Sequence, residues 1–403
     1  MGDYSGKRGK VSARVKVRKV IIPVFMLLFF QFVLSWNPAF SEEVRVRVLT
    51  NRASVEISSS APTYLINNKT GDSITFAVNR ATYSFKPDAS GIKMVAFEGD
   101  TPPLADFFPC EIIIKPEIAK NKISLNKREY RGALLIKSEN FSLDVINILD
   151  IEDYIRGTIK YEISPRWPED AVKAHIVAAR TYALFQMRNK KNGDFYLESS
   201  VLSQVYGGCS GEDTVADALV DETRGEYIDY EGNIIEGFYH ACCGGYTEDV
   251  LNVWGIQRSY LHRTRCPFCK ESPHYYWEKK FSFNQIQSIL KKNGIDLTGI
   301  IEIRVKEKSS TDRVLNLEIR HQKGRLHISG TDFRRFLGYN DLPSTLFTIH
   351  QRNRGEIIFK GRGWGHGVGM CQWGARGMAL LGYNYREILK FYYPGTEIKK
   401  LER

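Results

Sequence analysis

The sequence predicts an α+β protein in which a β-rich N-terminal lobe packs on a larger, mixed α/β lobe. Between residues 44 and 149, short runs alternate apolar and polar side chains and are separated by Gly, Asn, Asp and Pro, which is typical of strands and turns. Beyond residue 150, apolar residues also recur at spacings of three and four, which is typical of helices. We therefore divide the chain into a leader at residues 1–41, a β-rich lobe at 42–145 and the larger lobe at 146–403.

The N-terminus holds much of the chain's positive charge. The first 19 residues contain seven Lys and Arg and one Asp, a net charge of +6 out of a formal +11 for the whole chain. The basic balance is therefore not the signature of a basic face on a folded domain, and we expect no nucleic-acid partner.

An apolar run at residues 20–36 follows this basic segment. Together they resemble the first two regions of a secretory signal, and Ala39 and Ser41 place small residues where cleavage after Ser41 requires them. The alternative is an uncleaved membrane anchor, because about 17 apolar residues is near the lower limit for a membrane span. In either case we expect the rest of the chain to be exported, to the periplasm or the outer face of the cytoplasmic membrane.

The alternating runs give the strands of the β-rich lobe. We expect them at residues 44–49, 63–66, 73–78, 92–97, 111–115, 134–137 and 141–149.

Residues 155–187 are the segment around which the larger lobe is organised. An apolar, strand-like run leads to Glu162, the chain breaks at Ser164-Pro165, and a helix begins near Pro168 with two acids in its first turn. Apolar residues on both sides of this helix indicate that it is covered on most sides. Arg180 within it therefore needs an anionic or hydrogen-bonding partner.

The rest of the larger lobe alternates between helical and strand patterns. We expect helices at residues 216–223, 281–292, 372–381 and 385–391, and strands at residues 234–239, 300–305, 314–319, 326–329 and 357–359.

Glu162 is the first candidate for chemistry. Its neighbours Tyr161, Ile163 and Trp167 would partly remove the carboxyl group from water, which favours its neutral form and raises its pKa. A general acid that cleaves a glycosidic bond needs such a pKa. The alternative is that Glu162 caps the following helix or pairs with Arg180.

Ordinary glycosidases use a second carboxylate. The nearest acids in the sequence are Glu152, Asp153, Glu169 and Asp170. Acids at the start of a helix usually interact with the helix dipole, so none of the four stands out as a catalytic partner.

Three further side chains could contact a sugar. Arg180 could orient Glu162 or bind an acid or N-acetyl group of the substrate, or it could form a buried salt bridge that fixes its helix. Gln204 and Tyr206 lie in a polar loop and suit a sugar-binding rim, with an amide for hydroxyl groups and a ring for stacking. The alternative is a plain surface loop.

Four residues are candidate ligands of a metal ion: His240, Cys243, Cys266 and Cys269. A Cys-x-x-Cys pair with an upstream Cys and His suits a tetrahedral Zn²⁺, and a closed set of four would be structural rather than catalytic. The alternatives are a disulfide from Cys243 to Cys266 or Cys269, and a His240 that serves the cleft. The other cysteines, apart from neighbouring Cys242, are scattered.

The segment GRGWGHGVGMCQWGA at residues 361–375 is rich in glycine. It has neither the glycine spacing of a dinucleotide site nor the Lys of a phosphate-binding loop. Glycine at every second position instead permits close backbone approach and unusual dihedral angles. We expect Trp364, His366, Gln372 and Trp373 to line a saccharide groove, although a lone His is more often structural.

These motifs together resemble the SpoIID/LytB domain family. The likeness covers the chain from about Val44 to its C-terminus and consists of Glu162-Ile163-Ser164-Pro165, Ala178-Ala179-Arg180-Thr181-Tyr182-Ala183-Leu184, His240 with Gly244-Gly245, Val253-Trp254-Gly255, and residues 361–375.

The resemblance implies a lytic transglycosylase that cleaves peptidoglycan glycan strands between N-acetylmuramic acid and N-acetylglucosamine, with a preference for glycan stripped of its peptides. In the family, the Glu of this turn is the proposed acid/base, which implies that role for Glu162 without a second carboxylate. His240, Gly244, Gly245 and Trp254 would then shape the groove. The chemistry needs no cofactor, although some members of the family carry a zinc ion.

LytB-like relatives suggest a different class of function. They are described as enhancers of a cell-wall amidase, so the alternative is a glycan-binding partner of an amidase that does not itself turn over glycan. An envelope scaffold is a third reading.

Overall fold

The computed structural model describes residues 42–76, 82–96, 106–190, 193–200, 203–352 and 355–402. The expected leader lies outside the described residues, as do the last residues of the strands expected at 73–78 and 92–97. In the described part of the chain, no helix is both long and apolar enough to cross a membrane. Phe40–Arg403 form one compact unit.

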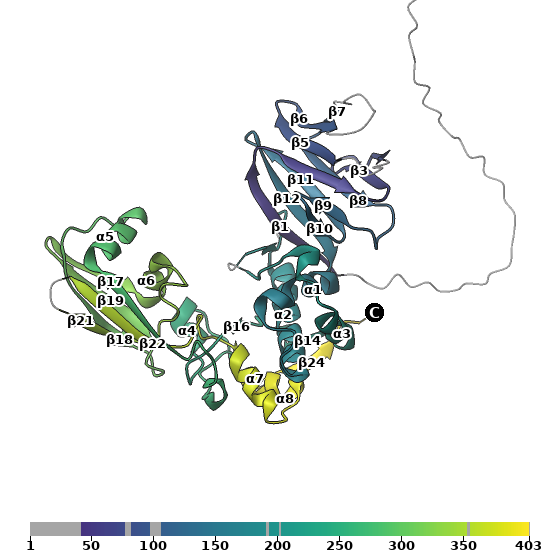
Figure 1. Cartoon of the computed structure of the whole chain (residues 1–403). Helices are drawn as coiled ribbons and strands as arrows, with labels where there is room; N and C mark the ends of the chain where they lie inside the picture. The colour runs from purple at the N-terminus through teal and green to yellow at the C-terminus, as the bar shows by residue number, and fades with distance from the viewer. Residues whose placement is uncertain are drawn as a thin grey trace, which may run out of the picture. The chain divides into compact units, whose positions relative to one another are not determined.

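Two antiparallel sheets make up the N-terminal region (Figure 1). The first has seven strands in the order β13 (Leu197–Glu198), β1 (Glu43–Arg52), β12 (Ser142–Asp150), β11 (Ala133–Glu139), β8 (Glu111–Pro116), β3 (Thr63–Asn67) and β4 (Ser73–Phe76). The second has six, in the order β10 (Arg128–Tyr130), β9 (Ile123–Leu125), β2 (Val55–Ser59), β5 (Thr82–Asp88), β6 (Gly91–Ala96) and β7 (Asp106–Phe108). Among the described strands of these two sheets, only the two-residue β13 pairs in parallel, with β1.

The alternation read from the sequence is what allows these sheets to share a core. On β1, Val44 and Val46 are fully buried, whereas Arg45 and Arg47 between them are half-buried. Apolar side chains from both sheets join one cluster, which continues into the helices that follow and ends at Ile234. The core therefore crosses residue 145, and the boundary placed there stays a prediction.

Helix α1 (Ile151–Glu162) corrects the strand-like run expected before Glu162. Asp150 caps the helix by accepting a hydrogen bond from the backbone N–H of Glu152, and two acids occupy the first turn, where the helix dipole favours them. Ile151, Tyr154, Ile155 and Ile159 are buried at the three- and four-residue spacings of a helix face. Alternation alone could not distinguish this short apolar run from a strand.

Helix α2 (Glu169–Asn189) follows α1 and is nearly covered on all sides, as the sequence predicts. Arg180 is fully buried on it, and its guanidinium donates to Glu152 Oε2 on α1 from Nη2 at 2.7 Å and from Nε at 3.2 Å. Nη1 donates to the carbonyl oxygen of Glu226 at 3.0 Å. The salt-bridge alternative for Arg180 is therefore the correct one, and the residue is not available to a substrate.

The C-terminal elements return to α2. Helices α7 (Gln372–Leu380) and α8 (Tyr385–Tyr392), which form where the sequence predicts them, both pack against α2 (yellow in Figure 1). Around them lie η1 (Gly208–Gly211), α3 (Thr214–Glu222), a small sheet of β15 (Asn233–Ile234), β14 (Glu226–Tyr230) and β24 (Glu397–Lys400), the parallel pair of β16 (Tyr239–His240) and β23 (Met370–Cys371), α4 (Val250–Trp254) and η2 (Pro267–Cys269). The single strand expected at 234–239 is therefore not formed: its first residue ends β15 and its last residue begins β16.

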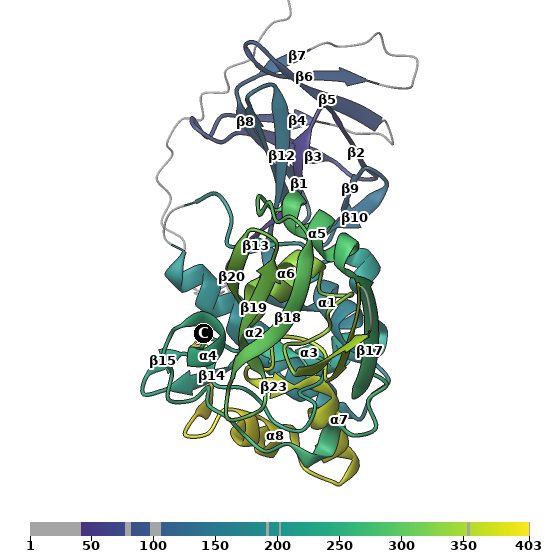
Figure 2. The same cartoon turned by 90° about the vertical axis from the view of Figure 1, so that its left-hand side faces the viewer.

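A separate hydrophobic core lies between residues 283 and 359. It is built by the sheets β17 (Tyr276–Ser282), β22 (Glu356–Arg362), β21 (Phe347–Arg352) and β18 (Ile300–Lys308), β19 (Val314–His321), β20 (Gly324–Ser329), with helices α5 (Phe283–Lys292) and α6 (Gly330–Leu337). Figure 2 shows β18, β19 and β20 side by side, and α6 packs against the last two. The overall class is α+β, as predicted, but the larger lobe holds more than one core.

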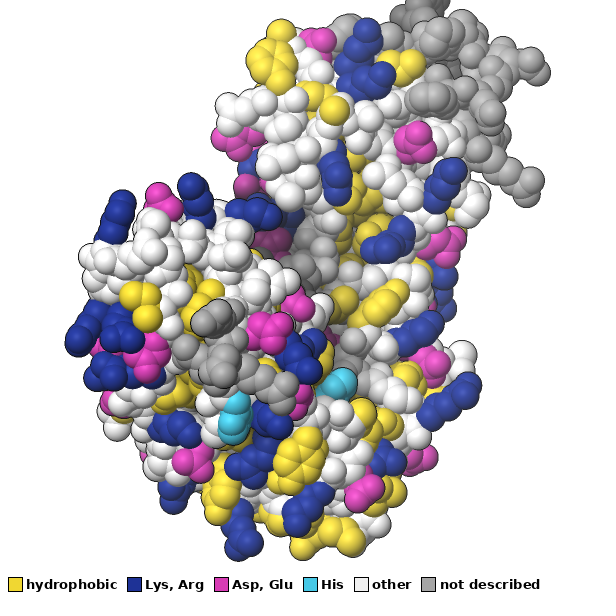
Figure 3. All heavy atoms as spheres, turned by 60° about the vertical axis from the view of Figure 1, so that its left-hand side comes forward, with side chains coloured by type: hydrophobic (Ala, Val, Ile, Leu, Met, Phe, Trp, Pro, Cys, Tyr) yellow, Lys and Arg dark blue, Asp and Glu magenta, His cyan; other side chains and the backbone are white. Residues whose placement is uncertain are grey.

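Basic and acidic side chains are mixed on the surface. On the face drawn in Figure 3, Lys and Arg (dark blue) lie among Asp and Glu (magenta) rather than gathering over one element.

Replacing Arg180 with Met should destabilise the protein strongly, because the Glu152 carboxylate would stay buried without its partner. We expect the free energy of unfolding to fall by about 3–5 kcal/mol in denaturant titrations. Arg188→Met on the same helix is the matched control, because that side chain is 55% exposed, and it should change stability by no more than about 0.5 kcal/mol. Equal effects of the two substitutions would contradict this account of the ion pair.

Candidate functional site

Glu162 is the last residue of α1, and its carboxyl group is held between a loop and the start of α7, which come from distant parts of the chain. Oε1 accepts a hydrogen bond from the backbone N–H of Val205 at 3.1 Å. The side chain of Gln372, the first residue of α7, also hydrogen-bonds the carboxyl group. Burial raises the pKa of Glu162, and the two hydrogen bonds oppose this because they favour the charged form. The direction agrees with the sequence-based prediction.

The neighbours that bury the carboxyl group are only partly those that the sequence suggested. Ile163 is buried, but Tyr161 is 45% exposed and its hydroxyl lies 3.0 Å from Ser210 Oγ. Trp167 is half-buried and meets the ring of Trp373 edge-on, with the centroids 5.1 Å apart. The structure thus brings the turn after Glu162 next to the start of α7.

Two tyrosines, the buried Tyr154 and the half-buried Tyr239, belong to the same surroundings. Tyr154 Oη donates to Gln204 Oε1, and Gln204 Nε2 donates to Tyr239 Oη, both at 2.9 Å. The pKa of each tyrosine is raised well above its ordinary value, mainly by burial and next by the charge of Glu162. Sequence reasoning missed both residues because, within apolar runs, they look like ordinary core aromatics.

Gln204 and Tyr206 do not form an exposed rim, and that prediction is corrected. They are 1% and 3% exposed, and Tyr206 Oη donates to Asn147 Oδ1 at 2.7 Å. The loop can approach this closely because α1 has a glycine at Gly157, where a Cβ atom would lie only 2.4 Å from the Tyr206 ring. Gln204 thus joins the two tyrosines beside Glu162, Tyr206 packs against Tyr154, and neither side chain is exposed.

The glycine-rich segment adopts the unusual backbone that the sequence predicts. Gly363, Gly365, Gly367 and Gly369 all have positive φ, between 69° and 110°. The four glycines are followed by β23, whose parallel pairing with β16 places Tyr239 opposite Met370. Because Gln372 directly follows β23, this pairing places Gln372 close to Tyr239.

His366 is held as a neutral imidazole. Nδ1 accepts from the backbone N–H of Val368 at 3.1 Å, so Nε2 carries the proton and donates to the carbonyl oxygen of Tyr239 at 2.9 Å. Its pKa lies well below the ordinary value, first because it is buried. Its ring lies 4.9 Å from that of Trp254, which is 40% exposed. His366 therefore supports an accessible aromatic side chain and carries no positive charge at neutral pH.

The residues in and around the turn after β16 that were predicted to line the groove have structural roles. His240 is 4% exposed, and its Nδ1 donates to the carbonyl oxygen of Val368 at 3.0 Å. Gly244 and Gly245 have φ of +74° and +118°, which lets the turn pass close to the end of β22. Trp364 is half-buried against His274, with the centroids 4.7 Å apart. A buried His240 does not face an open groove.

His175 on α2 is a buried group that sequence reasoning missed. Neither ring nitrogen has a hydrogen-bond partner among the described residues, and burial lowers its pKa to about 3. The ring lies edge-on to Tyr239 with the centroids 4.5 Å apart. On the sequence it falls in the middle of a buried helical pattern, which gives no signal for a polar role.

The four acids considered as a second catalytic carboxylate have other roles. Glu152 pairs with Arg180, Asp153 lies 3.7 Å from Arg156, Asp170 accepts from the backbone N–H of Tyr385, and Glu169 is 74% exposed beside Lys173. Among the described residues, no carboxylate contributes to the pKa shift of Glu162. The site therefore holds a single catalytic carboxyl candidate.

The cysteine cluster differs from the predicted ligand set in one member. The sulfur atoms of Cys243, Cys266, Cys269 and Cys371 are buried and lie within 4.8 Å of one another. His240 is replaced by Cys371 because the β16–β23 pairing places Cys371 opposite His240 in the sheet. The cysteines are free thiols, so the structure contains no disulfide from Cys243 to Cys266 or Cys269.

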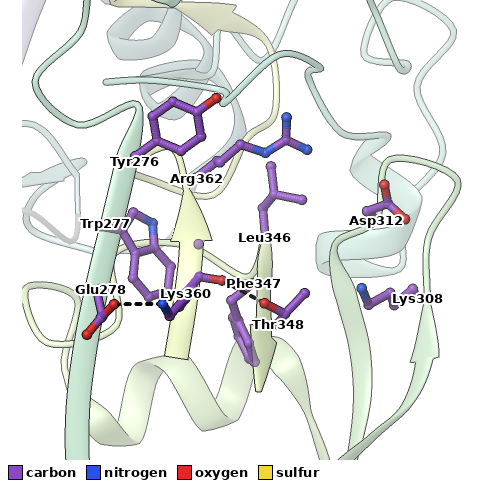
Figure 4. A pocket seen from close by; sticks show the side chains of 11 residues that line it. Tyr276, Trp277, Glu278, Lys308, Asp312, Leu346, Phe347, Thr348, Lys360 and Arg362 are labelled. Atoms are coloured by element: carbon purple, nitrogen blue, oxygen red, sulfur yellow. Dashed lines mark hydrogen bonds and ion pairs between the residues drawn. The ribbon is translucent and has the colours of Figure 1, made fainter. Parts of the chain in front are cut away.

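A pocket of about 630 Å³ opens elsewhere in the chain, over β17, β21 and β22 (Figure 4). Tyr276, Trp277 and Arg362 line it, and none of the residues predicted for the functional site does. We assign the candidate site to Glu162 because none of the residues that line this pocket was predicted to be catalytic.

Parts of the chain match two family models, and most of it aligns with a known relative. A family model described as Stage II sporulation protein (SpoIID) matches residues 139–230, and one described as a domain of unknown function matches residues 258–369. The chain is 37% identical over 281 residues to an uncharacterized protein of Brachyspira hyodysenteriae, covering 70% of this chain and 75% of the relative.

Two relatives with descriptive names come from Bacillus subtilis. Stage II sporulation protein D is 28% identical over 310 residues, or 71% of this chain and 87% of the relative. The Amidase enhancer is 28% identical over 337 residues, or 71% of this chain but only 46% of that protein. The chain belongs to the SpoIID family.

The raised pKa of Glu162 should appear in the pH dependence of stability. Relative to Glu162→Gln, the wild-type protein should lose stability as the pH rises from the ordinary Glu value of 4.5 through the raised pKa, because the folded state holds the proton more tightly than the unfolded chain. Thermal unfolding of both proteins from about pH 4 to about pH 8 measures this difference. A difference that does not change with pH would contradict the shift.

Proposed function

We propose that this protein cleaves peptidoglycan glycan strands between N-acetylmuramic acid and N-acetylglucosamine as a lytic transglycosylase, with Glu162 as its acid/base. The observation that carries the proposal is a half-buried carboxyl group, held by the backbone N–H of Val205 and the side chain of Gln372, whose pKa is raised by desolvation without a contribution from a second carboxylate among the described residues. A hydrolase that activates water would need that second group. Family membership supports the cell wall as the place of action.

The environment of Glu162 suits both halves of such a reaction. The protonated carboxyl group donates its proton to the glycosidic oxygen as the bond from C1 to that oxygen breaks. The resulting carboxylate is stabilised by the N–H of Val205 and by Gln372, and it then takes the proton of the sugar's own C6 hydroxyl. The C6 oxygen bonds to C1, which gives a 1,6-anhydro end and returns Glu162 to its protonated form.

Tryptophans offer the contacts that a glycan needs. Trp167 and Trp373 form a half-buried pair on the two segments that meet at Glu162, and Trp254 presents an exposed ring beside His366. Flat rings of this kind pack against the apolar faces of sugars. We propose that these residues bind glycan stripped of its peptides, outside the cytoplasm, and that no cofactor takes part in the chemistry.

One relative favours a second candidate function. Because a Bacillus subtilis relative is named Amidase enhancer, the same surface could bind glycan and assist a cell-wall amidase without cleaving the strand. The two functions differ in whether glycan products form.

Peptide-free glycan strands incubated with the full-length protein should yield products with 1,6-anhydro ends, detected by mass spectrometry. Glu162→Gln should lower the rate by about 10²–10⁴-fold, the range that a general acid supplies. Glu169→Gln, which alters an exposed carboxylate at the start of the next helix, is the matched control and should retain activity. Reducing-end products would show a hydrolase, and glycan binding without products would favour the amidase enhancer.

Gln372 should tune the pH range of the reaction. Its hydrogen bond favours the charged form of Glu162, so Gln372→Ala should raise the pKa of Glu162 further. The activity, which requires the protonated acid, should then fall at a higher pH than in the wild type. Gln322→Ala, at an exposed glutamine between β19 and β20, should leave the profile unchanged. A shift to lower pH in Gln372→Ala would contradict the arrangement.

A further inference from the structure

We propose that Cys243, Cys266, Cys269 and Cys371 together hold one structural Zn²⁺ ion, which fixes the start of α7 beside Glu162. The proposal does not depend on the proposed reaction, because it concerns a site that Glu162 does not enter.

The geometry of the four sulfur atoms suits a single tetrahedral ion. All four lie within 4.8 Å of one another, and Cys243 Sγ and Cys269 Sγ are 3.5 Å apart. With Zn–S bonds of about 2.3 Å, the sulfurs of a tetrahedral site are separated by about 3.8 Å. The sulfurs are too far apart for a disulfide bond of about 2.05 Å, and the set is compact enough to surround one ion. Four thiolates leave no open position, so the ion would be structural.

The surroundings offer the outer hydrogen bonds that thiolate ligands need. Cys371 Sγ accepts from the backbone N–H of Cys243 at 3.2 Å and of Gly374 at 3.3 Å. Tyr392 Oη lies 3.1 Å from Cys266 Sγ and can donate its proton to the sulfur. Gly374 allows this packing, because a Cβ atom there would lie 2.7 Å from Cys266 Sγ.

The charge near the cluster is complementary to a metal–thiolate centre. One Zn²⁺ with four thiolates carries a net charge of −2, which is costly in the interior without a counter-charge. Arg313 is 1% exposed and donates from Nη2 to the carbonyl oxygen of Cys243 at 2.8 Å. Its Nε and Nη1 have no hydrogen-bond partner in the described part of the chain. A buried arginine with two unused donor nitrogens is explained if a buried anionic centre lies beside it.

The ion would join three segments that are far apart in the sequence. Cys243 lies in the turn after β16, Cys266 and Cys269 lie at η2, and Cys371 is the N-cap of α7. The residue after Cys371 is Gln372, which hydrogen-bonds Glu162. The metal centre would therefore hold in place the amide that contacts the catalytic candidate.

Metal analysis of the full-length protein, purified without chelators, tests the proposal. We expect one zinc ion per chain by inductively coupled plasma mass spectrometry. Co²⁺ exchanged into the site should show sulfur-to-cobalt charge-transfer absorption and the visible bands of a tetrahedral ion. Removing the metal with a chelator should lower Tm by about 5 °C or more, and Zn²⁺ but not Mg²⁺ should restore it. The four thiols should become open to alkylation only after the metal is removed.

Substitutions test the ligand set. Cys266→Ser and Cys371→Ser should bind less than a tenth of the zinc, whereas Cys242→Ser, in the same turn but outside the set, and Cys209→Ser, at η1, should keep it. Because a ligand variant could fail to fold, the chelation experiment on the wild-type protein stands as an independent measurement. Iron in place of zinc, disulfides among the four residues in metal-free protein, or zinc that is lost from Cys242→Ser but kept by Cys243→Ser would each overturn the proposal.

Discussion

The buried ion pair of Arg180 and Glu152 is the constraint from which the arrangement of the helices follows. A guanidinium with no exposed surface must have its donors satisfied, and it reaches α1, the end of α3 and the start of β14 at once. The second oxygen of Glu152 accepts from the N–H of Gly225, so the carboxylate is satisfied as well. With α1 fixed against α2 in this way, the position of Glu162 at the end of α1 is fixed too.

The candidate site is assembled at that end from parts that lie far apart along the chain. Val205 supplies a backbone N–H, Gln372 supplies a side-chain amide, and Tyr154 and Tyr239 lie close enough for the charge of Glu162 to affect them. Burial and hydrogen bonding act in opposite directions on the same carboxyl group. A group that must first give up a proton and then take one back benefits from that balance, because neither form is too strongly favoured.

Local sequence patterns predicted much of the secondary structure, and they failed where contacts between distant parts of the chain determine the structure. Alternation predicted β1, helical spacing predicted α2, α7 and α8, and alternate glycines predicted the positive φ angles of the loop. The apolar run before Glu162 was too short for a helical period to be recognised. Gln204 and Tyr206 were predicted to lie in an exposed loop because their burial depends on a close approach to Gly157 on α1, which the local sequence does not show. Cys371 could not be grouped with the other three cysteines, because a parallel pairing between distant strands brings it there.

The loop between β22 and β23 has a further consequence for how the protein can vary. A Cβ atom at the four left-handed glycines would lie within 2.0–2.7 Å of other groups, namely Cys242 O for Gly363, His240 Cβ for Gly365, Arg313 Cζ for Gly367 and Phe238 O for Gly369. Those positions are closed to side chains both by backbone conformation and by space. With this backbone kept, side chains can be exchanged only at the alternate positions, so the contacts of the loop are adjustable through residues 364, 366 and 368 alone.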